Sequence, residues 1–139
     1  MNNKNYDIAK IEKELYDALR LSGVLHNSQI FMGTRPKVDI PSDKDAFIVV
    51  SVPSDVIDMN AFGRFIARID IYARDKKVDG AGQIKNVNRL IELHDKVFDL
   101  LPIITNKYSF DLMGELGDSD SLGYHVTLIN LYAIAKNTN

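Results

Sequence analysis

The sequence predicts an α+β fold, in the form of a two-layer sandwich with two helices on one face of a mostly antiparallel sheet of about five strands. Two segments carry apolar residues at helical spacing, and strand-like apolar runs lie between and after them. The 139 residues contain no internal repeat and no interdomain linker, and this length is typical of one domain. We therefore expect a single domain over residues 1–139 in the order α-β-β-β-α-β-β, with flexible tails at residues 1–5 and 136–139.

A first helix is predicted from Tyr6 to Leu21. Its apolar face is formed by Ile8, Ile11, Leu15, Ala18 and Leu19. Asn5 precedes the helix and is a good N-cap, because its side-chain oxygen can accept hydrogen bonds from the first turn. Gly23 follows the helix, and glycine readily adopts the left-handed conformation that ends one.

The region after this helix predicts two strands separated by a loop. The first strand, Val24–Gly33, is interrupted by the polar residues 26–29. Thr34–Asp45 contains two prolines and is expected to be a loop or an irregular edge. Ala46–Val52 is a continuous, β-branched run, as expected of a central strand covered on both faces, and Pro53 ends it because proline cannot donate to a sheet ladder.

A third strand is predicted over Ala61–Arg74, where apolar and polar residues alternate. The side expected to face the core carries Phe65, Ala67, Ile69, Ile71 and Ala73. The other side carries Arg64, Ile66, Arg68, Asp70, Tyr72 and Arg74. We expect this second side to be mostly in contact with solvent.

The remainder predicts a helix and two further strands. A polar, glycine-bearing loop at residues 75–82 leads to a helix over Ile84–Leu101, which Pro102 bounds. Its apolar face is formed by Ile84, Val87, Leu90, Ile91, His94, Phe98 and Leu101. The last strands are Lys107–Leu116 and Gly123–Lys136, and short connections of this kind favour antiparallel pairing.

Composition excludes several classes of protein. The chain is 45% hydrophobic and 26% charged, and its longest uncharged apolar runs are far shorter than the roughly 20 residues that cross a bilayer. It has no cysteine, so disulfides, thiolate zinc sites and thiol nucleophiles are excluded. The net charge of −2 provides no global attraction to nucleic acid or to an anionic membrane. We expect no signal peptide and no membrane partner.

No motif for metal or cofactor binding is complete. None of the three histidines has a second ligand at metal-binding spacing. Gly80-Ala81-Gly82 lacks the third glycine of the dinucleotide pattern and the lysine of a P-loop. Residues 118–123 resemble the opening of a calcium loop, but Leu122 and Ile129 occupy positions that require oxygen ligands. We therefore expect no metal and no cofactor.

No catalytic motif is complete either. Two carboxylate pairs, Asp111 with Glu115 and Asp55 with Asp58, could share a proton as acid–base catalysts do. Each is more simply explained as a surface pair, and no serine lies in a nucleophile elbow. We therefore expect no catalytic residues and no enzyme activity.

One strip of residues is a candidate interface or the lining of a channel. It is formed by Arg64, Ile66, Arg68, Tyr72 and Arg74 on one face of the third strand, with Arg35 nearby in sequence. Arginine beside aromatic and aliphatic residues is typical of protein interfaces, and a channel carrying nucleic acid would also use arginine. Asp70 lies within the strip and the net charge is negative, and both favour an ordinary solvated sheet face over an interface or channel.

The predicted elements follow one another in a definite order. They are the opening helix that ends at Gly23, the segment Gln29–Gly33 before Arg35-Pro36, the strand 46–50, the charged strand 64–74, the helix 84–101 and the closing strand 123–128. This layout, over Ile8–Ala135, resembles that of the tail-terminator and neck (tail-completion) proteins of tailed bacteriophages and prophages. The resemblance is one of element order, and it transfers no catalytic or ligand residue.

The resemblance implies a structural role. Such proteins assemble as rings, commonly hexamers, that cap the tail tube and join it to the capsid connector. It implies a homo-oligomer whose partners are tail-tube and connector proteins, with DNA only passing through a channel. The protein would be made in the cytoplasm of the host bacterium and then reside in the tail or neck of the virion.

Two other functions stay open at this point. The chain could be a small monomeric module that binds a peptide or protein by strand addition at a sheet edge. It could also be a small hydrolase-like enzyme, in which Asp111 and Glu115 would converge in a pocket with His125 or arginine side chains.

Overall fold

The structure, a computed structural model, describes residues 7–34, 44–53, 55–59, 61–80, 82–120 and 122–136. These ranges contain both helices and strands, and the chain is an α+β protein. The elements are α1 (Ile8–Ser22), the 3-10 helix η1 (Asn27–Gln29), β1 (Ile30–Met32), β2 (Ala46–Ser51), β3 (Ile57–Asp58), β4 (Phe62–Arg74), β5 (Lys76–Val78), β6 (Gly82–Ile84), α2 (Val87–Phe98), β7 (Ile103–Ile104), β8 (Tyr108–Ser119) and β9 (Tyr124–Lys136).

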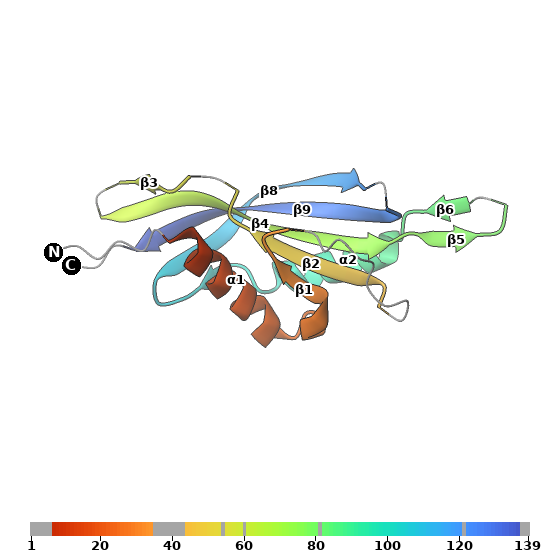
Figure 1. The fold of residues 1–139 in the computed structure, drawn as a ribbon, viewed down its shortest axis with the longest axis horizontal. Coiled ribbons are helices and arrows are strands. Elements are labelled where there is room, and N and C mark those ends of the chain that lie inside the picture. The colour runs from red at the N-terminus through yellow and green to blue at the C-terminus, as the bar shows by residue number, and fades with distance from the viewer. Residues whose placement is uncertain are drawn as a thin grey trace.

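One large sheet dominates the molecule (Figure 1). It has seven strands in the order β1-β2-β4-β9-β8-β7, and β3 pairs with the end of β4. The β1–β2 pair is parallel, whereas the other neighbours are antiparallel. Strands β5 and β6 form a separate two-stranded hairpin, which projects from one end of the molecule, while β3 lies at the opposite end (Figure 1).

The predicted two-layer sandwich with a mostly antiparallel five-stranded sheet is wrong. The sheet is a mixed, seven-stranded one, and it curls into a half-barrel. Three of its strands, β4, β8 and β9, are 12 or 13 residues long, and twist accumulates along strands of this length. A register shift in β8 between Leu112 and Gly114 adds a bulge, and bulges bend a strand further.

The predicted order of seven elements is also wrong, because it omits β3, β5, β6 and β7. Each of these strands has only two or three residues, which is too short for an alternating pattern to be recognised. Residues 75–82, predicted as a loop, contain β5 and the start of β6. The predicted strand from Val24 shrinks to β1, because the His26 side chain accepts a hydrogen bond from the backbone N–H of Ser28 and caps η1.

The helix boundaries differ from those predicted by a few residues. Asp7 caps α1, and its carboxylate accepts hydrogen bonds from the N–H groups of Ala9 and Lys10. The predicted cap, Asn5, lies outside the described residues, as do residues 1–4 and 137–139 of the predicted tails, whereas Lys136 belongs to β9. Gly23 does adopt the predicted left-handed conformation, with φ of 73°. Helix α2 begins later than predicted, since Ile84 pairs within β6.

The main core lies on one face of the sheet, here called the inner face, beneath both helices. Helix α1 contributes Ile11, Leu15 and Leu19, and helix α2 contributes Leu90, Leu93 and Val97. All of these side chains belong to the same cluster as the core-facing residues of β4. Those five residues, Phe65, Ala67, Ile69, Ile71 and Ala73, are buried, which confirms the predicted alternation along this strand.

The opposite, outer face carries a second and smaller cluster of aromatic residues. The rings of Phe47 and Tyr72 stack with their centroids 4.4 Å apart. Phe31 and Tyr124 approach Phe47 edge-on, at 5.9 Å and 5.2 Å. This cluster helps to explain why Ala46–Val50 of β2 are all buried, as predicted for a strand covered on both faces.

Candidate interface on the outer face

The predicted arginine strip lies on the outer face of β4, and the structure divides it into three parts. At its middle, Arg68 forms a bidentate ion pair with the Asp70 carboxylate, in which Nε donates to Oδ1 at 3.2 Å and Nη2 donates to Oδ2 at 3.0 Å. Asp70 is only 7% exposed. Burial raises the pKa of Asp70, and the charge and hydrogen bonds of Arg68 only partly offset this effect. The charge of Arg68 is therefore engaged within the molecule.

The second part of the strip belongs to the aromatic cluster. Tyr72 stacks on Phe47, and the Arg74 guanidinium lies 5.2 Å from the centroid of the Tyr124 ring. Arg74 also donates a hydrogen bond from Nη2 to the backbone oxygen of Lys44 at 3.5 Å. These two residues thus stabilise the fold. Arg35 lies outside the described residues.

The third part, around Arg64 and Ile66, opens into a groove of about 410 Å³, here called the outer-face groove. It is lined by Asp55, Ile57, Arg64, Phe65, Ile66, Met113 and Tyr132. Strand β3 builds one side, because Ile57 pairs with Arg64. Ile66 and Tyr132 lie directly opposite each other on β4 and β9, so their side chains share the outer face.

The β8 bulge places Met113 in this groove. Leu112 pairs with Leu131 and Gly114 with Asn130, so that Met113 has no opposite residue in β9. An extra residue of this kind changes the direction in which neighbouring side chains point. Asp111 lies on one side of the bulge and is paired with Tyr132.

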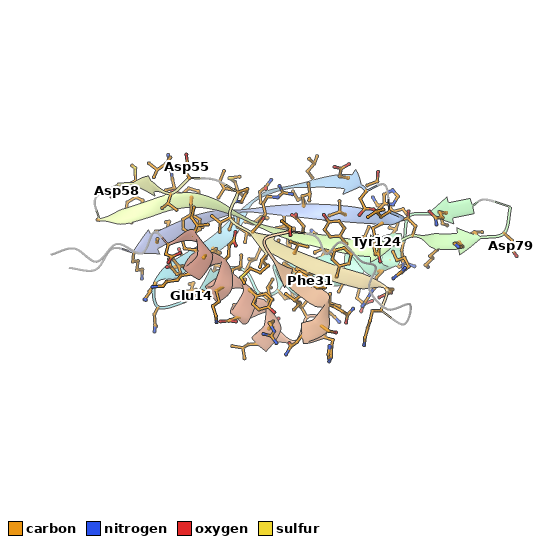
Figure 2. The ribbon with its side chains drawn as sticks, viewed as in Figure 1. Glu14, Phe31, Asp55, Asp58, Asp79 and Tyr124 are labelled. Carbon is orange, nitrogen blue, oxygen red and sulfur yellow. The ribbon has the colours of Figure 1, made fainter. Side chains whose placement is uncertain are left out.

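The outer-face groove is apolar and in contact with water. Ile57 and Met113 are each 49% exposed, and Tyr132 is 38% exposed. Asp55 and Arg64 both line it. Asp55 and Asp58 lie at one end of the molecule (Figure 2). An exposed apolar area with polar residues around it is typical of a surface that contacts another protein.

A second, smaller pocket of about 290 Å³ lies on the inner side, between α2 and β8. His94 of α2 lies 2.7 Å from the Glu115 carboxylate through Nε2 and 3.3 Å from Asp95 through Nδ1. Its ring also stacks on Phe98, with the centroids 4.0 Å apart. Partial burial opposes the charged imidazolium, but the hydrogen bonds and charges of Glu115 and Asp95 outweigh burial and raise the pKa of His94. This arrangement ties α2 to the sheet.

The residues proposed for an enzyme do not converge. Asp111 pairs with Tyr132 on the outer face, whereas Glu115 pairs with Ile129 on the inner face. His125 instead lies 2.6 Å from Asp75, through Nδ1 and Oδ1. Asp111, Glu115 and His125 therefore do not form one site.

Two absences apply to the described ranges of the chain. Within them, no group of three or more histidine, aspartate or glutamate residues is placed to hold a metal ion. Among the described helices, neither is long and apolar enough to cross a membrane.

Sequence reasoning found Arg64 and Ile66 but missed Ile57, Met113 and Tyr132 as their neighbours in the groove. The alternation in the last strand does place Tyr132 on the same face as Asn130. Nothing in the sequence marks Met113, because the bulge depends on how β8 pairs with β9.

The comparisons with known proteins add no relatives. No protein-family model matches this sequence, and no curated protein is significantly similar to it.

Proposed function

We propose that this chain is a structural subunit of a phage or prophage head–tail or tail-terminator assembly, which acts by ring-forming self-association. The observation that carries the proposal is the outer-face groove, where apolar side chains from β3, β4, β8 and β9 lie close together and are exposed to solvent. Such surface is stabilised when a protein partner covers it. In a ring, the partner is a neighbouring copy, a tail-tube protein or a connector protein. The phage context comes from the resemblance in layout, and the elements α1, β2, β4, α2 and β9 on which that resemblance depends do follow one another in the structure.

The charges around the groove favour a protein partner over DNA. A DNA-binding face needs an excess of free basic groups to neutralise phosphates. Here Arg68 is paired with Asp70, and Arg74 belongs to the aromatic cluster. Asp55 lines the groove together with Arg64, and Asp111 pairs with the groove residue Tyr132. DNA therefore enters this proposal only as a molecule that passes through the finished ring.

A second candidate function, a monomeric peptide-binding module, rests on a different observation. Among the described strands, β7 pairs only with Ser109 and Phe110, so the stretch Asp111–Ser119 of β8 forms an edge of the sheet. An open edge can accept an extended peptide as an additional strand. The same edge could also join two subunits of a ring.

Sedimentation of the full chain over a range of concentrations tests the proposal. A ring subunit is expected to form a discrete larger species as concentration rises, or to do so when tail-tube protein is added. A constant monomer that does not bind tail-tube protein would contradict the proposal. The peptide-binding alternative instead expects a constant monomer whose β8 amide signals shift in NMR spectra when an extended peptide is added.

A further inference from the structure

The β5–β6 hairpin, here called the arm, projects from one end of the sheet (Figure 1). Its two strands pair through Lys76–Ile84, Lys77–Gln83 and Val78–Gly82, and all six residues are exposed. Val78 is 41% exposed and Ile84 42% exposed. An isolated two-stranded hairpin is marginally stable in water, so the arm gains from contact with another surface.

The arm has one apolar side. Residues directly opposite each other in an antiparallel pair share a face, and alternate residues along a strand do the same. Lys76, Val78 and Ile84 therefore lie on one side of the arm, and Lys77 and Gln83 lie on the other. The first side combines two exposed apolar residues with a positive charge.

The outer-face groove complements this side of the arm. Its apolar residues Ile57, Met113 and Tyr132 match Val78 and Ile84 in character. The charges are complementary in part, because Lys76 lies on the apolar side of the arm, while Asp55 lines the groove and Asp111 pairs with the groove residue Tyr132. Arg64 of the groove and Asp79 of the arm carry the opposite charges.

The two surfaces lie at opposite ends of one elongated molecule. Asp79, at the tip of the arm, is at one end, and Asp55 and Asp58 are at the other (Figure 2). The arm therefore cannot reach the groove of its own chain. A contact between the arm of one copy and the groove of the next is head-to-tail, and such contacts close into rings or continue as helical filaments.

We propose that the apolar side of the arm docks into the outer-face groove of a second copy of this chain. This inference rests on the proposed function, and it names the surfaces through which neighbouring subunits meet. The occupant of the groove is thus the β5–β6 hairpin of the neighbouring subunit.

The test uses one variant on each surface. V78D places a charge on the apolar side of the arm, and M113D does the same in the groove. Leu21 is 89% exposed on α1, so L21D is a matched control for adding an aspartate at an exposed apolar position. Q83D tests the other side of the arm. Circular dichroism confirms folding, and I57D replaces M113D if the bulge does not tolerate the substitution.

Docking makes a specific prediction for mixtures. V78D and M113D are each expected to associate at least about tenfold more weakly than the wild type, as loss of an interface anchor does. An equimolar mixture of V78D and M113D should form a dimer and nothing larger, because one intact arm and one intact groove remain. L21D and Q83D should associate like the wild type. Sedimentation velocity measures the association of each variant, of the mixture and of the wild type.

Four outcomes overturn the inference, and they separate it from the proposed function. If the wild type associates and V78D and M113D associate equally well, docking is wrong while self-association stands. If each variant is monomeric but the mixture gives no dimer, the arm does not pair with this groove. If the wild type stays monomeric to about 1 mM, where a contact with a Kd of about 1 mM would be half formed, and also does not bind tail-tube protein, both fail. A wild-type monomer that binds tail-tube protein through the groove leaves the proposed function but removes the second copy as occupant.

Discussion

The Arg68–Asp70 pair on the outer face allows a quantitative prediction about stability. In R68M the methionine keeps much of the aliphatic volume, but Asp70 loses the donors that contact both of its oxygens. The Asp70 carboxylate is then left largely buried without its positive partner. We expect R68M to unfold more easily than the wild type at neutral pH.

The structure sets the size of this effect. Breaking a fully buried pair costs about 3–5 kcal/mol, whereas an exposed pair contributes roughly 0–1 kcal/mol. Here the Asp70 side chain is 10% exposed and the Arg68 side chain 30% exposed, so the pair lies between these limits. We expect R68M to lower the free energy of unfolding by about 2 kcal/mol. Urea unfolding followed by circular dichroism measures this difference.

The loss should depend on pH in one direction. Burial already raises the pKa of Asp70 above 3.8, and removal of Arg68 raises it further. A carboxyl group with a raised pKa in the folded state reduces stability as pH rises above the unfolded-state value. The difference in free energy of unfolding between the wild type and R68M should therefore be small at about pH 3.5, where Asp70 is largely protonated in the folded and unfolded states of both proteins. It should be largest at neutral pH.

A double variant checks the assignment. D70N removes the buried charge, so R68M/D70N is expected to be more stable than R68M alone at neutral pH. A loss of less than about 0.5 kcal/mol in R68M, the usual range of a surface substitution, would refute the reasoning. So would an equal loss at acidic and neutral pH.

Three further predictions concern the helices. E115Q removes one of the partners that raise the pKa of His94. Protonated His94 stabilises the fold below about pH 6.5, and this contribution is lost as pH rises through the raised pKa of His94. In urea unfolding, E115Q should therefore lower the free energy of unfolding by about 0.5 kcal/mol near pH 5.5 and change it little near pH 8.5. L93A empties a fully buried position under α2 and should cost about 2–5 kcal/mol, whereas L21A at an exposed position should stay within about 0.5 kcal/mol in the same assay. G23A forces a left-handed alanine at the end of α1, where φ is 73° and nothing lies within 4 Å of an added Cβ, so thermal unfolding should report a loss of about 1 kcal/mol from backbone strain alone.

The parts of the fold that were predictable are those whose signals are local and long. The alternation along β4 extends over enough residues to identify both faces, and the helical spacing in α1 and α2 does the same. The end of β8 was not predictable, because its polar residues join the sheet only through pairing with β9. Asp120 then closes the hairpin by accepting hydrogen bonds from the N–H groups of Leu122 and Tyr124.

The mixed character of the sheet also depends on distant contacts. Strand β1 runs parallel to β2, and the Gln29 side chain just before it donates a hydrogen bond to the backbone oxygen of Ala46 at 2.8 Å. Gln29 is buried, although the sequence places it in a polar interruption. No local pattern distinguishes a glutamine that caps a strand pair in the core from one in a loop.

The arginine strip explains why the candidate site could be located only in part. Alternation correctly placed Arg64, Arg68 and Arg74 on one face of β4, but three different surroundings determine what each residue does. Arg68 is paired with Asp70, Arg74 lies over Tyr124, and Arg64 borders an apolar groove. A strip that resembles a basic surface in the sequence therefore carries little free positive charge near its centre. For this reason the apolar groove, and not the row of arginines, is the part of this face that most needs a partner.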